Sequence, residues 1–187
     1  IMTIIYIILA ITLAIGVCLI SAYNGLVRLN QRVKQAWSGI TIQLKYRADL
    51  LPNLVETVKG YAKHEKELFT LVTEARSASM GANTPKAASE AERKAQAVMT
   101  QILAVAENYP DLKANDSFTK LQDELSDIEN KIQAARRAYN NGVEELNSKV
   151  MSFPIVLFGG FGFKSQEYFN VSEEERAKIE KPAEVKF

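Results

Sequence analysis

The residues of this sequence that most invite a chemical role are its single histidine and the acids beside it. His64 is followed at once by Glu65, with Glu67 two residues further on. A zinc site takes about four ligands, and no second histidine or neighbouring cysteine is present to complete one. The Glu-x-x-His spacing of metal sites in helical bundles is also missing from a partner segment. We therefore predict no metal ligand here and interpret His64 as a surface or helix-capping residue.

Acids elsewhere offer a second kind of chemistry, because a pair of carboxylates with different pKa values performs acid-base catalysis. The candidates are Asp49, Glu56, Glu107, Asp111, Glu124 and Glu129. Charges at this density on helices usually form solvated faces or salt bridges between helices. The glycine-rich segment Gly159–Gly162 lacks the strand-loop-helix context and the following Lys-Ser/Thr of a phosphate-binding loop. We predict no catalytic residue, no cofactor and no metal, and therefore no enzyme.

A structural role suits the charged residues better. Buried ionic groups sometimes fix the register of packed helices. The residues that we assign to such a polar network are Arg47, Arg76, Glu107, Glu124 and Glu129. Two Tyr-Asn pairs, Tyr23-Asn24 and Tyr139-Asn140, with Asn147 further on, are expected to form hydrogen bonds between packed helices.

The elements that position these residues begin with an apolar stretch. Ile1 to Val27 contains no charged side chain, and Arg28 is the first in the chain. A helix of about 20 such residues crosses a hydrocarbon core of about 30 Å. A cleaved signal sequence would need a basic start and a small-x-small cleavage site, and neither is visible. The stretch predicts a retained membrane-spanning anchor over residues 1–23, in which Cys18 serves as a small apolar residue.

Charge asymmetry predicts the orientation of this anchor. Five basic residues and no acid lie between Arg28 and Ala48, namely Arg28, Arg32, Lys34, Lys45 and Arg47. Lys and Arg near a span stay on the cytoplasmic side, so the N-terminus is expected outside and the long C-terminal part inside the cell. Two interpretations stay open for the residues nearest the span, Arg28, Arg32 and Lys34: they lie near anionic lipid headgroups, or they are simply solvated positions on a helix.

A long apolar stripe follows the anchor. Its members recur at alternating spacings of three and four: Leu26, Leu29, Val33, Trp37, Ile40, Leu44, Ala48, Leu51, Val55, Val58 and Ala62, with Phe69 and Val72 in the same phase. This pattern predicts one amphipathic helix packed in a bundle or coiled coil. Pro52 interrupts it, and two interpretations stay open: a kink within one long helix, which we favour, or a tight hairpin with Pro52 opening a new helix.

Two further helices are predicted. An alanine-rich pattern from Ala88 to Tyr109 follows the loop-forming segment 77–85 and stops before Pro110, because the residue before proline disfavours helix. The other begins after Asn115-Asp116-Ser117, any of which can cap a helix. It runs to about Ser152, a length of about 50 Å, and ends at Phe153-Pro154.

The tail differs in kind. Ile155 to Phe163 is apolar and glycine-rich without helical period, so it is expected to cover the bundle end, enter the membrane interface or meet another copy of the chain. Ser172–Arg176 predicts a short capped helix. The fold class is thus all-α: an N-terminal transmembrane helix continuing into an antiparallel bundle of three to four long helices, with an irregular tail. The predicted boundaries are 1–23 for the anchor, 24–153 for the bundle and 154–187 for the tail.

The order of these motifs resembles the LemA family. The residues that carry the resemblance are the span with Tyr23-Asn24, then Ala36-Trp37, Arg47 to Glu56, His64-Glu65, Ala75-Arg76, Ala106 to Lys113, Leu121-Gln122, Glu124-Leu125, Glu129-Asn130, Arg136, Tyr139-Asn140, Val143, Asn147, Phe153-Pro154 and Tyr168-Phe169. The resemblance covers the chain from the anchor nearly to Phe187. It implies a bacterial inner-membrane protein with an extracytoplasmic N-terminus and a helical domain inside the cell, and it implies no established reaction.

These patterns favour a binding function over catalysis. With a net charge of +1 over 187 residues, the chain lacks the basic field of a nucleic-acid-binding protein. We expect the lipid bilayer as one partner and further copies of the chain as another. The leading hypothesis is a membrane-anchored helical scaffold that self-associates at the cytoplasmic face through its helical stripes and apolar tail. The alternative is a membrane-tethered adaptor that recruits an unidentified membrane or cytoplasmic protein.

Overall fold

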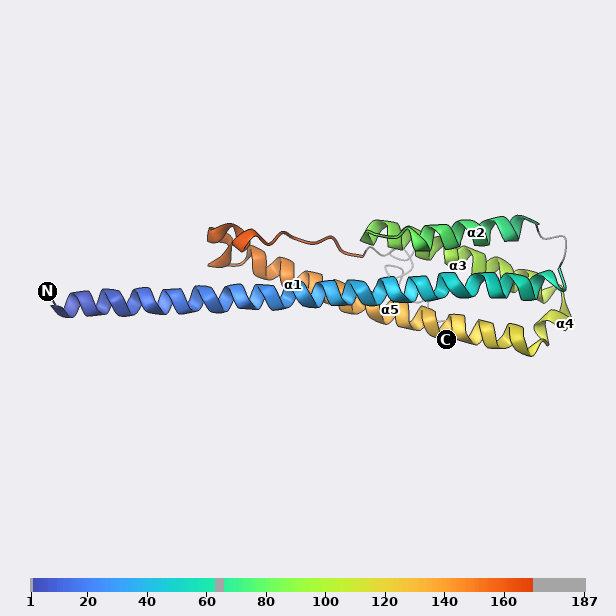
Figure 1. The fold of residues 1–187 in the computed structure, drawn as a ribbon, viewed down its shortest axis with the longest axis horizontal. Coiled ribbons are helices and arrows are strands. Elements are labelled where there is room, and N and C mark those ends of the chain that lie inside the picture. The colour runs from blue at the N-terminus through green and yellow to red at the C-terminus, as the bar shows by residue number, and fades with distance from the viewer. Residues whose placement is uncertain (1, 63–65, 170–187) are drawn as a thin grey trace, which may run out of the picture. The chain divides into compact units, whose positions relative to one another are not determined.

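The computed structural model describes residues 2–62 and 66–169, which form helices and connecting segments with no strand among them (Figure 1). The helices are α1 (Met2–Lys59), α2 (Lys66–Met80), α3 (Pro85–Glu107), α4 (Pro110–Lys113) and α5 (Asp116–Met151), and a 3-10 helix, η1 (Ile155–Gly162), follows. The all-α prediction is confirmed. The short helix predicted at Ser172–Arg176 lies outside the described residues.

The chain divides into two compact units. The anchor unit comprises residues 2–37 and 137–167, and the bundle unit comprises residues 38–62, 66–136, 168 and 169. The long helices α1 and α5 each contribute one portion to either unit. The predicted apolar stripe is divided accordingly, with Leu26 to Val33 in the anchor unit and Ile40 to Val58 in the bundle unit.

The bundle unit is an antiparallel four-helix arrangement of α1 from Ser38, α2, α3 and α5 up to Arg136 (Figure 1). Its core takes the predicted apolar positions from every helix. On α1, Ile40, Leu44 and Leu51 are almost completely buried. On α3, a run of buried alanines begins at Ala88 and Ala91, and such small side chains let a neighbouring helix approach closely.

The chain reverses direction after α1 at Gly60, and not at Pro52. Helix α1 continues through Pro52 to Lys59, which confirms the single-helix interpretation. The amides of Tyr61 and Ala62 then both donate to the carbonyl of Val58, closing the helix in a tight turn. The prediction of one uninterrupted helical stripe to Val72 is therefore wrong, because Val72 lies on the separate helix α2.

Side-chain caps fix the starts of the two later helices. The hydroxyl oxygen of Thr84 accepts from the amide of Ala87 at 3.2 Å, and Pro85 occupies the first turn of α3. The side-chain oxygen of Asn115 accepts from the amides of Ser117 and Phe118 at 2.9 and 3.0 Å. Of the three predicted capping residues, Asn115 is thus the one that caps α5.

In the anchor unit, α1 up to Trp37 packs against α5 from Arg137 onward. The helices approach closely at Gly142, where an added Cβ would lie 3.2 Å from Cγ2 of Val33. Next to this contact, the rings of Trp37 and Tyr139 lie 5.5 Å apart. Leu26 closes the apolar seam toward the N-terminal part of α1 and is fully buried.

Candidate membrane contact and buried polar cluster

The first part of α1 carries its large apolar side chains on the outside. Between Ile4 and Ile20, the large apolar side chains that are more than half exposed have exposed fractions from 53% at Ile5 to 70% at Leu13. In the described residues this is the one helix long and apolar enough to cross a bilayer, and none of its apolar window is buried. Burying such surface in lipid is favourable, at about 25 cal/mol per Å² of apolar area. The segment therefore has the composition, length and exposure of a membrane span.

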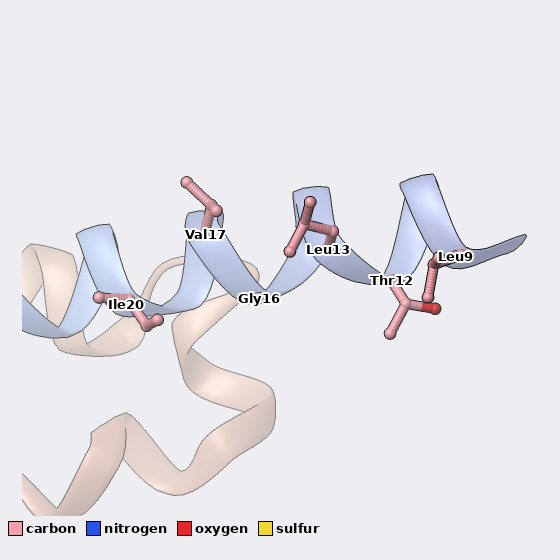
Figure 2. A pocket seen from close by; sticks show the side chains of 6 residues that line it. All are labelled: Leu9, Thr12, Leu13, Gly16, Val17 and Ile20. Carbon is pink, nitrogen blue, oxygen red and sulfur yellow. The ribbon is translucent and has the colours of Figure 1, made fainter. Parts of the chain in front are cut away.

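One face of this span is indented at Gly16. Leu9, Thr12, Leu13, Val17 and Ile20 surround the bare backbone there (Figure 2), and a Cβ added at Gly16 would meet nothing within 4 Å. The hydroxyl of Thr12 donates to the carbonyl of Ile8 at 2.9 Å, so it needs no water partner in an apolar environment. Small residues on a span let a second helix approach closely.

Tyr139 and Asn147 of α5 form hydrogen bonds with an extended segment rather than with a neighbouring helix. The hydroxyl of Tyr139 donates to the carbonyl of Glu167 at 2.9 Å. The side chain of Asn147 both donates to the carbonyl of Gln166, at 3.0 Å, and accepts from its amide, at 2.8 Å. The prediction that Tyr139 and Asn147 link packed helices is therefore wrong. They hold the segment after η1 against α5.

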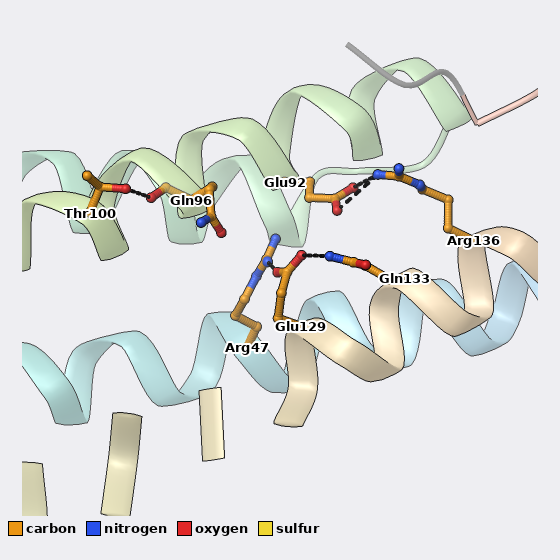
Figure 3. Close-up of polar contacts among 7 residues, drawn as sticks. All are labelled: Arg47, Glu92, Gln96, Thr100, Glu129, Gln133 and Arg136. Atoms are coloured by element: carbon orange, nitrogen blue, oxygen red, sulfur yellow. Dashed lines mark hydrogen bonds and ion pairs between the residues drawn. The ribbon is translucent and has the colours of Figure 1, made fainter. Parts of the chain in front are cut away.

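The bundle unit contains a cluster of charged side chains from three helices (Figure 3). Arg47 of α1 binds Glu129 of α5 at 2.6 Å, and Glu129 also accepts from Gln133 at 3.3 Å. Arg136 of α5 binds Glu92 of α3 at 3.3 Å, and both side chains are largely buried. We call Arg47, Glu92, Glu129 and Arg136 the buried polar cluster.

Arg47 is the most deeply buried member of this cluster, with 3% of its side chain exposed. Burial lowers the pKa of its guanidinium, and the nearby charges of Glu129 and Glu92 partly offset that effect. Two of its nitrogens, Nε and Nη2, have no hydrogen-bond partner in the described structure. Breaking a buried pair leaves a charge uncompensated, whereas the intact pair adds little net stability. The cluster is thus suited to fixing how helices pack.

The structure separates the other members of the predicted network. Arg76 approaches Asp49 at 4.0 Å, with both side chains about half exposed. Glu124 accepts a hydrogen bond from Tyr46, which raises the pKa of the Tyr46 phenol. Glu107 is exposed at the end of α3. Of the five residues predicted to form the network, only Arg47 and Glu129 form an ion pair with each other. Their neighbours Glu92 and Arg136 were not predicted as members.

Among the six acids considered for acid-base catalysis, no two carboxylates contact each other in the described part of the chain. Asp49 and Glu129 face arginines, Glu124 faces a tyrosine, and Glu56 binds Lys59 at 2.6 Å. Glu107 and Asp111 are exposed. His64 and Glu65 lie outside the described residues, and Glu67 is exposed on α2. Over residues 2–62 and 66–169, no group of three or more potential metal ligands is found.

The basic residues after the span differ in their surroundings. Arg28, Lys34 and Lys45 are exposed, and Arg32 is exposed while it pairs with Glu145 at 3.1 Å. Arg47 belongs to the buried polar cluster, so it does not share this basic surface. The rings of Phe161 and Phe163 pack on Tyr23, which gives part of the apolar tail a partner within the anchor unit.

Comparison with known proteins identifies relatives over most of the chain. The sequence model of the LemA family matches residues 36–187. The Protein LemA of Metamycoplasma hominis is 30% identical over 70% of this chain and 60% of its own length. The magnetosome protein MamQ of Magnetospirillum gryphiswaldense is 22% identical over 81% of this chain and 66% of its own length.

A similar match is found to the magnetosome protein MamQ 2 of Paramagnetospirillum magneticum, at 22% identity over 81% of this chain and 65% of that protein. The chain thus spans between 60% and 66% of the length of these relatives. None of their names refers to a reaction. With these relatives, the exposed apolar helix indicates a membrane-associated protein.

Proposed function

The chain belongs to the LemA family, and on that basis we propose that it is a non-catalytic, membrane-anchored helical scaffold that self-associates at the cytoplasmic face of the bacterial inner membrane. The observation that carries this proposal is the apolar window of α1, none of which is buried, whereas the apolar stripe from Ile40 to Val58 on the same helix is buried. The names of the MamQ relatives refer to the magnetosome and to no reaction.

We place the proposed self-association in the span, in place of the helical stripe that was expected to carry it. The stripe from Ile40 to Val58 is buried within the chain, so it offers no apolar surface to another copy. The indented face around Gly16 is apolar and open. Helices in lipid associate through close packing at small residues, because apolar burial alone gives no advantage there.

Anchoring and orientation can be tested on the full chain in bacterial vesicles. We expect the protein to stay in the membrane after carbonate washing, because about 20 apolar residues cross the bilayer. For orientation, Asn141→Cys in a Cys18→Ala background places a single thiol on the exposed surface of α5. An impermeant thiol reagent added outside spheroplasts should label it only after the inner membrane is opened. Release by carbonate, or labelling of intact spheroplasts, would overturn anchor or orientation respectively.

Self-association can be tested by energy transfer between labelled copies reconstituted in vesicles. Gly16→Ile fills the indented face, whereas Ala14→Ile adds the same bulk at an exposed position on the other side of the helix. We expect Gly16→Ile to reduce energy transfer and Ala14→Ile to leave it unchanged.

Two other results would redirect the proposal. Equal effects of both substitutions would move the contact away from Gly16. A strictly monomeric unsubstituted protein would remove self-association altogether and leave the adaptor as the remaining hypothesis. Crosslinking followed by purification would then be expected to recover a different protein rather than a second copy.

A further inference from the structure

The turn of chain after α5 carries a group of large apolar side chains that the fold leaves uncovered. Met151, Phe153, Val156 and Leu157 have 64%, 78%, 49% and 69% of their surfaces exposed. Isolated exposed apolar residues are ordinary on a protein surface, but four large ones within seven positions form a patch that marks a contact. We call these four residues the apolar platform.

The platform is held by specific contacts and is not a loose loop. Ile155, in its midst, is buried. A Cβ at Gly160 would lie 2.8 Å from Cγ1 of Val150, so η1 packs on α5 at a distance that only glycine permits. The backbone is left-handed at Gly160, Phe161 and Gly162. Such a conformation disfavours a residue with a Cβ, so the surrounding packing must hold Phe161 in place.

The same turn attaches the platform to the end of the membrane span. The rings of Phe161 and Phe163 lie 5.8 and 5.9 Å from the ring of Tyr23. Figure 1 shows η1 curled beside α1, on the N-terminal side of the point where α5 ends. Since about 20 residues cross the hydrocarbon core and Arg28 is the first charge, Tyr23 lies where the span leaves the lipid. Tyrosine also favours this interfacial layer.

The charges around the platform suit a lipid surface. Between Leu146 and Gln166 the sequence has two charged residues, Lys149 and Lys164, and no acid. Both lysines are exposed, as is Arg28 on the span side. Basic residues next to apolar ones are the combination that binds the headgroup layer of an anionic membrane, at about 1 kcal/mol for each close Lys or Arg.

We propose that the apolar platform inserts into the interfacial layer of the cytoplasmic leaflet, next to the point where α1 leaves the same membrane. The bilayer is the occupant because the platform continues the lipid-facing surface of the span and is flanked by lysines. The protein then has two membrane contacts, a span and a shallow one. This inference rests on the anchoring role of α1 proposed above.

The experiment measures the depth of single probes in the full chain. The native Cys18 carries an environment-sensitive fluorophore in one sample, and Leu157→Cys or Asn141→Cys carries it in two others, both made in a Cys18→Ala background. Leu157 and Asn141 are both exposed. Asn141 precedes Met151 by ten residues on α5, which places it about 15 Å from the platform end of that helix. The protein is reconstituted in vesicles of mixed neutral and anionic lipid, some with nitroxides near the headgroup and some with nitroxides deep in the chains.

We expect deep nitroxides to quench the probe at Cys18, shallow nitroxides to quench the probe at Leu157→Cys several-fold more than deep ones, and neither to quench the probe at Asn141→Cys. Circular dichroism of each labelled protein checks that it is folded. If the Leu157→Cys probe behaves like the Asn141→Cys probe while Cys18 is still quenched, the platform does not enter the membrane and the anchor stands.

Two other outcomes also decide the matter. Absence of quenching at Cys18 would overturn the anchor itself, and the proposed function with it. If the Leu157→Cys probe is protected from a water-soluble quencher but not reached by lipid nitroxides, and if unlabelled Leu157→Cys forms disulfide-linked dimers, then a second copy covers the platform. That result would overturn the lipid assignment.

Discussion

Two stretches of the same helix use similar side chains in opposite ways. Before Tyr23, the leucines and isoleucines of α1 surround the helix and most are exposed. From Ile40 onward they are buried, with the exception of Ile42, which is 59% exposed. The difference lies in what accompanies them. Without charged residues there is no polar side to face water, so the whole circumference suits lipid. Where polar residues cover the other positions, the apolar stripe turns inward. The arrangement of apolar residues around the helix, and not their number, thus determines whether they face lipid or the protein core.

The largest difference between the two stretches is expected when one leucine in each is replaced by alanine. Leu51→Ala removes a fully buried side chain of the bundle unit, and a substitution of this kind lowers the free energy of unfolding by about 2 to 5 kcal/mol. Leu13→Ala removes an exposed one and should leave the unfolding of the bundle unit unchanged. Denaturant titrations followed by circular dichroism in mild detergent measure both. An equal loss for Leu13→Ala would mean that the span is packed against protein.

A buried ion pair and an exposed ion pair provide a second comparison between buried and exposed positions. Arg47→Ala removes a cation with 3% of its side chain exposed and should destabilise the protein by about 3 kcal/mol, because Glu129 loses its partner in a partly buried place. Arg32→Ala breaks a pair whose side chains are 66% and 53% exposed, and less than about 1 kcal/mol is expected. Thermal and denaturant unfolding of the two variants provide the measurement. Equal free energies of unfolding for the two variants would show that the buried polar cluster has no structural role.

Helix contact is probed by two glycines with different neighbours. Gly39→Ala should stabilise the protein by about 0.5 to 1 kcal/mol, because alanine is the better helix former and nothing lies within 4 Å of the new methyl group. Gly142→Ala places its methyl group 3.2 Å from Val33, so it should gain less than Gly39→Ala or lose stability. Unfolding free energies from urea titrations compare the two. A larger gain at Gly142 would show that the helices are not in close contact there.

Tyr139→Phe tests a single hydrogen bond of the anchor unit. Loss of the hydrogen bond to Glu167 should cost about 1 kcal/mol near neutral pH. Burial raises the pKa of Tyr139 above its ordinary value of 10.0, so the folded state holds the phenolic proton more tightly than the unfolded state. Its contribution is therefore complete below pH 10.0 and is lost as the pH rises through the folded pKa.

The pH dependence separates this titration from the lost hydrogen bond. Urea unfolding is measured near neutrality and again above pH 10.0, the ordinary pKa of tyrosine. We expect a smaller alkaline loss of stability in Tyr139→Phe than in the unsubstituted protein. Identical alkaline losses would show that another group is responsible.

Periodicity alone predicted most of the fold, because the helices have long stripes and clear ends. From local chemistry, Asn115 could be identified as one of three candidate caps and Pro110 as a helix breaker. The turn at Gly60 was missed because the apolar positions on α2 continue the phase of α1. The signal that would have found it is glycine directly after Lys59, a common way to end a helix.

Contacts between distant residues were harder to predict. Glu92 lies within the alanine stripe of α3, beside Ala91, and a charge in such a place indicates a buried partner. Nothing in the sequence identifies that partner as Arg136, because the pairing depends on how α3 and α5 are aligned. The same is true of Tyr23 with Phe161 and Phe163, which lie far apart in the chain and meet only through the left-handed turn.

Asn147 offers the segment after η1 what a neighbouring strand would offer. One N–H of its side-chain amide donates to the carbonyl of Gln166, and its side-chain oxygen accepts from the backbone amide of the same residue. With Tyr139, which donates to the carbonyl of Glu167, Asn147 fixes to α5 a segment that has neither helix nor sheet. Irregular backbone in this protein is consequently a poor guide to local motion: in native-state hydrogen exchange, the Gln166 amide should be protected as if it belonged to regular secondary structure.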